Sequence, residues 1–142
     1  MTIDHQATCV AIGNRAVLIE GKPGAGKSSL ALALIDRGAL LVGDDGVELE
    51  VRAGRLFAHP HPNTAGLLEV RNLGLLPFPV RDEAPVALIL LLDAQAPRFV
   101  ERPEWAARAG VPLPLLRLAP EGAALALKAE LALDRHGLSW SG

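Results

Sequence analysis

Residues 21–28 read Gly-Lys-Pro-Gly-Ala-Gly-Lys-Ser, which matches the pattern G-x-x-x-x-G-K-[ST]. The run lies between an apolar segment, 16–19, and a segment of strong helix formers, 28–37. In such a loop the glycines let backbone N–H groups curl around phosphate oxygens, and the helix N-terminus adds positive potential. The lysine reaches the β- and γ-phosphates, and the last hydroxyl can ligate Mg²⁺. The sequence therefore predicts a phosphate-binding loop (P-loop) between a strand and a helix.

The expected ligands of this loop are a nucleotide and Mg²⁺. A glycine-rich turn that only starts a helix is the alternative, but it gives no reason for the Lys-Ser pair. The residues expected to bind the nucleotide are Gly21, Lys22, Pro23, Gly24, Ala25, Gly26, Lys27, Ser28 and Ser29.

The pattern around the loop predicts an α/β fold. Two strand-like runs within 7–20 are separated by Gly-Asn, which favours a hairpin, and the helix over 28–37 stops at a glycine. The other expected elements are a buried strand at 39–42, a hairpin of 47–52 with 55–58, a loop at 59–62, a helix or strand at 64–70, a buried strand at 86–92, a connection at 98–108 with a helical turn around Trp105, an edge strand or extended segment at 111–118, and a helix at 121–135.

Composition favours one domain, residues 1–142, without a nucleic-acid or membrane partner. Half of the 142 residues are apolar, the net charge is −2, and aromatic residues make up 4% with no Tyr, so neither a basic stripe nor a stacking surface is expected. The apolar run 86–92 is far shorter than the ~20 residues that a bilayer requires. One cysteine and no signal-peptide pattern are typical of a cytoplasmic protein.

Asp44 and Asp45 follow the buried strand directly after the P-loop helix. We expect them beside the phosphates, where a carboxylate can hold Mg²⁺ or accept a hydroxyl proton. The alternative is an Asp-Asp-Gly turn that only joins two strands.

The histidines carry weaker signals. His59 and His61 form His-Pro-His, but no Cys or obvious third ligand lies nearby, which disfavours a metal site. His136 can cap the last helix, and His5 by position alone can belong to a frayed terminus.

Residues 21–45, together with Leu-Leu-Glu-Val-Arg-Asn-Leu-Gly-Leu-Leu at 67–76, resemble the catalytic domain of HPr kinase/phosphorylase. The resemblance is strong from about residue 5 to 77. It implies a fold similar to that of phosphoenolpyruvate carboxykinase, with a mixed β-sheet, the P-loop helix and a C-terminal helix. It also implies a bacterial kinase that transfers phosphate from ATP to a serine of HPr, the phosphocarrier of the sugar phosphotransferase system.

The resemblance assigns roles residue by residue. His5 would orient or tune the Asp pair, and Asp45 would accept the proton of the substrate serine, with Asp44 beside it. The family's catalytic residues would correspond to His5, Lys27, Asp44, Asp45 and Arg102, with Arg98 an alternative for the arginine, and its Mg²⁺ ligands to Ser28 and Glu69.

Several positions depart from the family. The chain resembles a short form with the catalytic core alone, and Asn72 stands where the family has Gly. The loop after 67–76 is shorter than the family's HPr-binding loop. The segment 119–124 lacks the Lys and Arg that the family uses to dephosphorylate phosphoserine-HPr, so we expect kinase activity with weak or no phosphorylase activity.

Two alternatives stay open at this point. A P-loop alone also suits a kinase that acts on another acceptor. A nucleotide-sensing interaction module that transfers no phosphate is the non-enzyme alternative, although intact Asp44, Asp45, Glu69 and His5 disfavour it. The family's tendency to form hexamers leaves the oligomeric state open.

Overall fold

Strand β3 (Arg15–Gly21) leads through the P-loop into helix α1 (Lys27–Asp36), as the sequence predicts. The computed structural model describes residues 1–141, and Gly142, the last residue of the expected domain, lies outside the described residues. The remaining elements are β1 (Thr2–His5), β2 (Thr8–Ile12), β4 (Leu40–Gly43), β5 (Val47–Arg52), β6 (Arg55–Pro60), β7 (Leu67–Val70), β8 (Gly74–Pro77), β9 (Ala84–Leu92), β10 (Glu104–Arg108), β11 (Val111–Leu118) and α2 (Leu125–His136).

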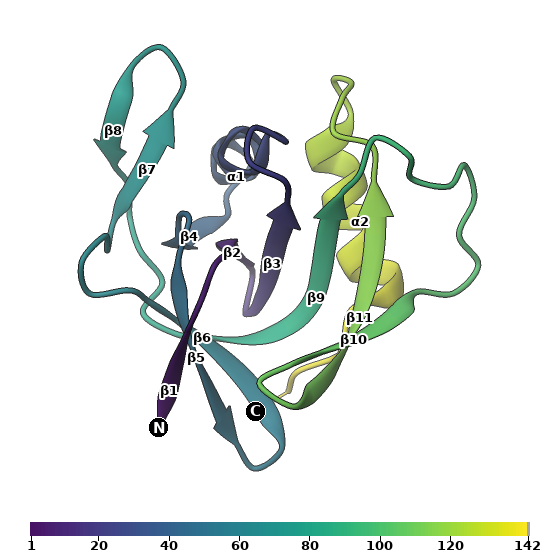
Figure 1. The fold of residues 1–142 in the computed structure, drawn as a ribbon, viewed down its shortest axis with the longest axis horizontal. Helices are drawn as coiled ribbons and strands as arrows, with labels where there is room; N and C mark the ends of the chain where they lie inside the picture. Colours follow the sequence, from purple (N-terminus) through teal and green to yellow (C-terminus); the bar gives the residue numbers. More distant parts are fainter. Residues whose placement is uncertain (142) are drawn as a thin grey trace.

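A curled mixed sheet forms the framework (Figure 1). Its strands follow the order β1-β5-β6-β9-β3-β2-β4, and β11 pairs with both β9 and β10. Strand β9 is parallel to β3 and β11, whereas its first residues pair antiparallel with β6. Strands β7 and β8 form a separate hairpin beside α1. The long strand β9 thus links the P-loop strand to both halves of the sheet.

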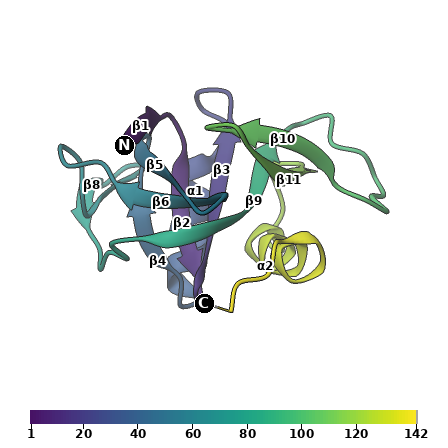
Figure 2. The same ribbon diagram turned by 90° about the horizontal axis from the view of Figure 1, so that it is seen from below.

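Both faces of the central strands are buried. Val17 and Ile19 of β3 pack in a core cluster with residues of α1 and α2. Ala16 and Leu18 point to the other side and pack in a second cluster with residues of β5 and β6. Figure 2 shows α2 against one side of β9 and β11. Because β3 is covered on both sides, the P-loop that follows it starts from a rigid position.

Most sequence-based expectations for the first half of the chain are confirmed. The β2–β3 hairpin, α1, β4 and the β5–β6 hairpin lie where the pattern places them. The segment left open at 64–70 contains strand β7. The loop expected at 59–62 begins late, because β6 continues through Pro60, which pairs with Val47 at the end of the strand.

Two expectations for the second half need correction. The helical turn around Trp105 is wrong, since Trp105 lies in β10 and pairs with Pro114. The two residues joining β10 to β11, Ala109 and Gly110, both have positive φ, which suits a tight hairpin turn. The strand expected at 111–118 is confirmed as β11: residues 111–115, which include both prolines, pair with β10, and residues 115–118 pair with β9. Helix α2 begins at Leu125 rather than at 121, after a glycine with φ of 97°.

Within residues 1–141, no helix is long and apolar enough to cross a membrane.

We predict that Gly43→Ala destabilises the protein. A Cβ at Gly43 would lie 2.5 Å from the carbonyl oxygen of Gly46 and 2.7 Å from Cγ1 of Val47, so the backbone after β4 would have to shift. The expected loss in the free energy of unfolding is about 1–3 kcal/mol, measured by urea denaturation. Gly46→Ala is the matched control, because a Cβ there meets nothing within 4 Å. Equal stability of the two variants would contradict the prediction.

Candidate active site

The buried carboxylate of Asp44 connects three segments of the chain. Its Oδ1 accepts hydrogen bonds from the hydroxyls of Thr8 at 2.9 Å and Ser28 at 2.7 Å. Its Oδ2 accepts a hydrogen bond from the backbone N–H of Glu69 at 2.9 Å. Asp44 and Thr8 are the buried polar residues of the described chain, and a buried carboxylate needs such donors. Asp44 therefore fixes β2, the start of α1 and β7 around one point.

The P-loop has the conformation expected of a phosphate cradle. Gly24 and Gly26 have φ of 80° and 103°, which side chains with a Cβ rarely adopt. Gly26 is the N-cap of α1, and Lys27 Nζ donates to the carbonyl oxygen of Gly21 at 2.9 Å. The loop is thus closed by its own lysine, and the helix N-terminus faces the loop interior.

A cavity of about 290 Å³ brings most of the expected site residues together. It is lined by residues of the P-loop and by Thr8, Asp44, Asp45, Glu69 and Arg71. Asp45 is exposed and has φ of 62°, so the backbone turns immediately after the buried Asp44. Two adjacent carboxylates therefore have different environments, one buried and fully hydrogen-bonded and one open to the cavity.

The hairpin β7–β8 holds Glu69 at the cavity. Asn72 in its turn has φ of 73°, a left-handed conformation that Asn tolerates better than most residues with a Cβ. Asn is therefore compatible with the conformation of this turn.

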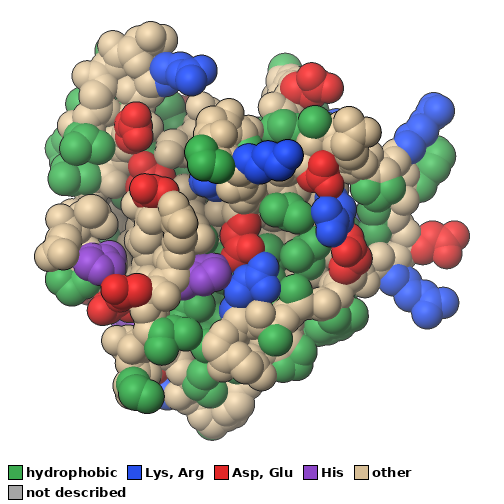
Figure 3. Space-filling model, viewed as in Figure 1, with side chains coloured by type: hydrophobic (Ala, Val, Ile, Leu, Met, Phe, Trp, Pro, Cys, Tyr) green, Lys and Arg blue, Asp and Glu red, His purple; other side chains and the backbone are tan. Residues whose placement is uncertain are grey.

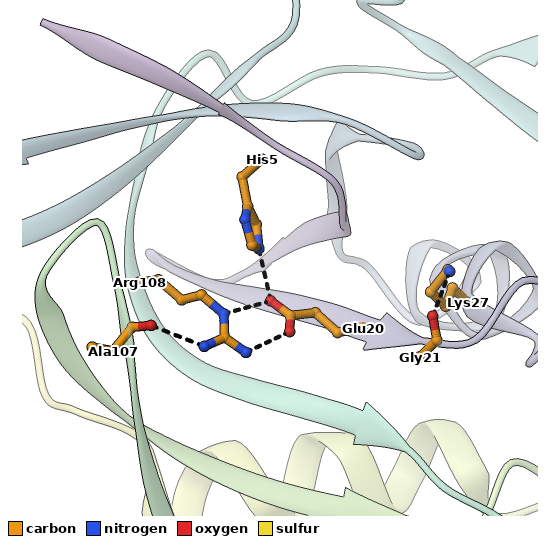
Figure 4. Close-up of polar contacts among 6 residues, drawn as sticks. All are labelled: His5, Glu20, Gly21, Lys27, Ala107 and Arg108. Carbon is orange, nitrogen blue, oxygen red and sulfur yellow. Dashed lines mark hydrogen bonds and ion pairs between the residues drawn. The ribbon is translucent and has the colours of Figure 1, made fainter.

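His5 lies beside the P-loop strand, and its partner differs from the expected one. Its Nε2 is 2.8 Å from Oε2 of Glu20, the residue directly before the P-loop (Figure 4). His5 belongs to β1, which pairs with β5, so it is not part of a frayed terminus. The hydrogen bond of His5 therefore goes to Glu20, and the expectation that His5 orients or tunes the Asp pair stays a prediction.

Arg108 completes this cluster. Its Nε and Nη2 donate to the two oxygens of Glu20 at 3.0 and 2.7 Å. Burial raises the pKa of Glu20, but the hydrogen bonds from His5 and Arg108 outweigh burial and lower this pKa to about 2. Glu20 therefore stays ionised at any ordinary pH. It also lines a second cavity of about 840 Å³ on the other side of the P-loop, with Lys22, Asp93 and Arg117.

The structure does not bring Arg102 or Arg98 to the 290 Å³ cavity. Arg102 lines a different pocket with Phe99 and Glu104. It lies on the connection between β9 and β10, which leaves the sheet on the side away from the β7–β8 hairpin (Figure 1). Figure 3 shows Lys and Arg side chains projecting from that edge of the molecule.

His59 and His61 each lie near one carboxylate. His59 Nε2 is 2.7 Å from Glu50, and His61 Nε2 is 3.6 Å from Asp4. Among residues 1–141, no group of three His, Cys, Asp or Glu side chains is placed to hold a metal ion by itself.

Sequence reasoning missed Thr8, Glu20 and Arg108. A threonine in a buried strand and a glutamate before a P-loop carry no motif of their own. One signal for Arg108 was present. Ala109-Gly110 repeats the Ala53-Gly54 pair of the β5–β6 hairpin, which predicts a second hairpin with Arg108 at the end of its first strand.

Comparison with known proteins matches the chain to one family. The sequence model of the HPr Serine kinase C-terminal domain matches residues 2–81. An HPr kinase/phosphorylase of Mycoplasma mycoides is 33% identical over 98 residues, covering 64% of this chain and 31% of the relative. That of Bordetella petrii is 52% identical over 61 residues, covering 42% of this chain and 20% of the relative. The chain therefore spans about a third or less of these curated relatives.

A solved structure matches over nearly the whole chain. The Hpr(Ser) kinase/phosphatase from Coxiella burnetii has a TM-score of 0.80 and 26% identity, with 93% of this chain and 94% of that chain covered. The expected α/β fold with a mixed sheet, a P-loop helix and a C-terminal helix is thereby confirmed.

Asp44→Ala is expected to lower the free energy of unfolding by about 1–3 kcal/mol, because the buried hydroxyl of Thr8 loses its acceptor. Asp45→Asn is the matched control, since the exposed neighbour can keep its left-handed backbone with Asn. Urea denaturation of both variants gives the comparison. The same unfolding midpoint for Asp44→Ala and the wild type would show that these hydrogen bonds do not stabilise the fold.

Glu20→Gln is expected to reduce stability in a pH-dependent manner. The folded-state pKa of Glu20, about 2, lies below the ordinary value of 4.5, so the ionised carboxylate stabilises the fold above about pH 4.5. The difference in unfolding free energy between wild type and variant should be about 1–3 kcal/mol at neutral pH and shrink as pH falls from 4.5 to 2.

Denaturation at a series of pH values measures this difference. Glu121→Gln, at an exposed position, provides the control. A difference that is constant from neutral pH to pH 2 would contradict the assignment.

Proposed function

Because this chain belongs to the HPr Serine kinase C-terminal domain family, we propose that it is an ATP-dependent kinase that phosphorylates a serine of an HPr-like phosphocarrier protein. One observation carries the proposal: the P-loop, Asp45 and Glu69 line the same cavity. Groups that would bind a nucleotide, hold a metal and accept a proton then lie in one place. A sensor that transfers no phosphate has no use for this combination.

The P-loop would bind the phosphates of ATP. Its backbone N–H groups and the N-terminus of α1 favour anionic oxygens, and Lys27 would move from Gly21 to the β- and γ-phosphates. Ser28 and Glu69 would hold Mg²⁺, which neutralises phosphate charge when bound. The Ser28 hydroxyl donates its hydrogen to Asp44, so its oxygen lone pairs remain for a metal.

Asp45 would act as the general base. In the proposed step its carboxylate accepts the proton of the substrate serine hydroxyl while the serine oxygen attacks the γ-phosphorus. The bond between that phosphorus and the β,γ-bridging oxygen breaks, and ADP leaves. A serine hydroxyl is a weak nucleophile, so a base in hydrogen-bond reach and neutralised phosphate charge supply most of the catalysis. Asp44, with its oxygens occupied by donors, would position Ser28 and Asp45.

The same proposal includes weak or absent phosphorylase activity and a bacterial cytoplasmic setting, where the kinase would regulate the phosphotransferase system. The segment 119–124 has no Lys or Arg to bind the phosphate of phosphoserine-HPr. Phosphate release from phosphoserine-HPr tests this part, and rapid release would contradict it. A homo-oligomer, which the family resemblance implies, also belongs to the proposal, without a fixed number of subunits.

The test is transfer of labelled phosphate from ATP to purified HPr of the same cell in the presence of Mg²⁺. We expect label on an HPr serine, with a loss of about 100-fold or more in Asp45→Asn and in Lys27→Ala. Asp45→Asn should still bind ATP, because the P-loop is intact, whereas Lys27→Ala should bind it more weakly.

Arg102→Ala serves as a further comparison. Because Arg102 lies outside the cavity, its removal should leave ATP binding unchanged. Tight ATP binding without labelled HPr would reject this acceptor in favour of another one or a sensor.

A further inference from the structure

Three segments far apart in sequence meet at the carboxylate of Glu20. His5 comes from β1, Glu20 from the end of β3, and Arg108 from the end of β10 (Figure 4). The side chains are largely buried, with exposed fractions of 23% for His5, 13% for Glu20 and 23% for Arg108. A contact that unites three strands at this depth restricts the orientation of each partner.

The carboxylate decides which nitrogen of His5 carries a proton. Arg108 contacts both oxygens of Glu20, and the lowered pKa of Glu20 keeps it ionised. An ionised carboxylate only accepts hydrogen bonds, so Nε2 of His5, at 2.8 Å, must be the donor. In neutral His5 the other nitrogen, Nδ1, then keeps a free lone pair.

The cluster is also tied to the P-loop through the backbone. Glu20 directly precedes Gly21, whose carbonyl oxygen accepts the hydrogen bond of Lys27 at 2.9 Å. Gly21 is closely packed: a Cβ there would lie 3.2 Å from both the Ala25 Cβ and the Leu92 carbonyl oxygen. Glu20 therefore directly precedes the residue that holds the P-loop lysine, and both residues lie in one closely packed junction.

We infer that Glu20, held by Arg108, is a positioning residue that fixes His5 beside the P-loop as a single tautomer, with Nε2 protonated and Nδ1 available as an acceptor. The effect of this tautomer on catalysis rests on the proposed kinase function, whereas the assignment of the tautomer itself does not. An imidazole held in this way can accept a hydrogen bond or a proton at Nδ1, and the carboxylate stabilises the imidazolium that results.

The molecule contains its own matched control. On the β5–β6 hairpin, His59 Nε2 is 2.7 Å from Glu50, which also accepts a hydrogen bond from Arg52 at 2.9 Å. This second His-Glu-Arg cluster has the same chemistry, but Glu50 does not line the P-loop cavities. A change at Glu50 should alter His59 and leave His5 unchanged.

The experiment is ¹⁵N NMR of the histidine rings in the full chain at about pH 8, above the usual pKa of histidine. His5→Asn assigns the His5 signals. We expect the Nε2-protonated tautomer for His5 in the wild type, its retention in Glu20→Gln, whose amide oxygen still accepts, and a mixture of tautomers in Glu20→Ala. Glu50→Ala should leave the His5 signals unchanged.

Steady-state kinetics with ATP and HPr then test the positioning role. We expect kcat of Glu20→Ala to fall about 10- to 100-fold, with KM for ATP within about twofold of wild type and partial recovery in Glu20→Gln. Glu50→Ala should keep the wild-type kcat.

Several results would overturn the inference. A mixed or Nδ1-protonated His5 in the wild type refutes it outright, and this measurement needs no variant that folds. An unchanged His5 spectrum in folded Glu20→Ala refutes the role of Glu20, and an unchanged kcat with a lost tautomer refutes the link to catalysis. If the wild type labels no HPr, the proposed function fails, while the wild-type ring spectrum still decides the tautomer.

Discussion

Hydrogen bonding to the buried Asp44 carboxylate is the constraint on which the rest of the site depends. A carboxylate in a protein interior is tolerated only when donors replace its water, and here Thr8, Ser28 and the Glu69 backbone supply them. These donors belong to β2, α1 and β7. Satisfying one buried charge therefore places the P-loop helix, the β4–β5 turn and the β7–β8 hairpin around a common cavity.

The same constraint gives two neighbouring aspartates different environments. Asp44 has its oxygens occupied, whereas the left-handed backbone at Asp45 directs the chain out of the core and leaves the second carboxylate exposed. The two sequence-based interpretations of residues 44–46 are therefore compatible. They form the turn between β4 and β5, and they also supply a carboxylate to the cavity.

The second carboxylate centre, Glu20, lies on the other side of the P-loop and depends on β9. That strand pairs with β3 along one edge and with β11 along the other, and β11 in turn carries β10 and Arg108. The guanidinium of Arg108 neutralises a carboxylate that would otherwise repel the phosphates of a bound nucleotide. The curled sheet thus sets the electrostatics of the P-loop junction as well as its position.

The sequence by itself determined the P-loop, the strand and helix that flank it, the Asp pair and the 67–76 motif, because each depends on neighbouring residues or on a short, regular spacing. Only the tertiary structure decided which aspartate is buried, that His5 meets Glu20 rather than the Asp pair, and that Arg108 joins them at Glu20 while Arg102 lines a separate pocket. These pairings join residues 15 to 88 positions apart. They arise from strand order and register, which local patterns do not encode.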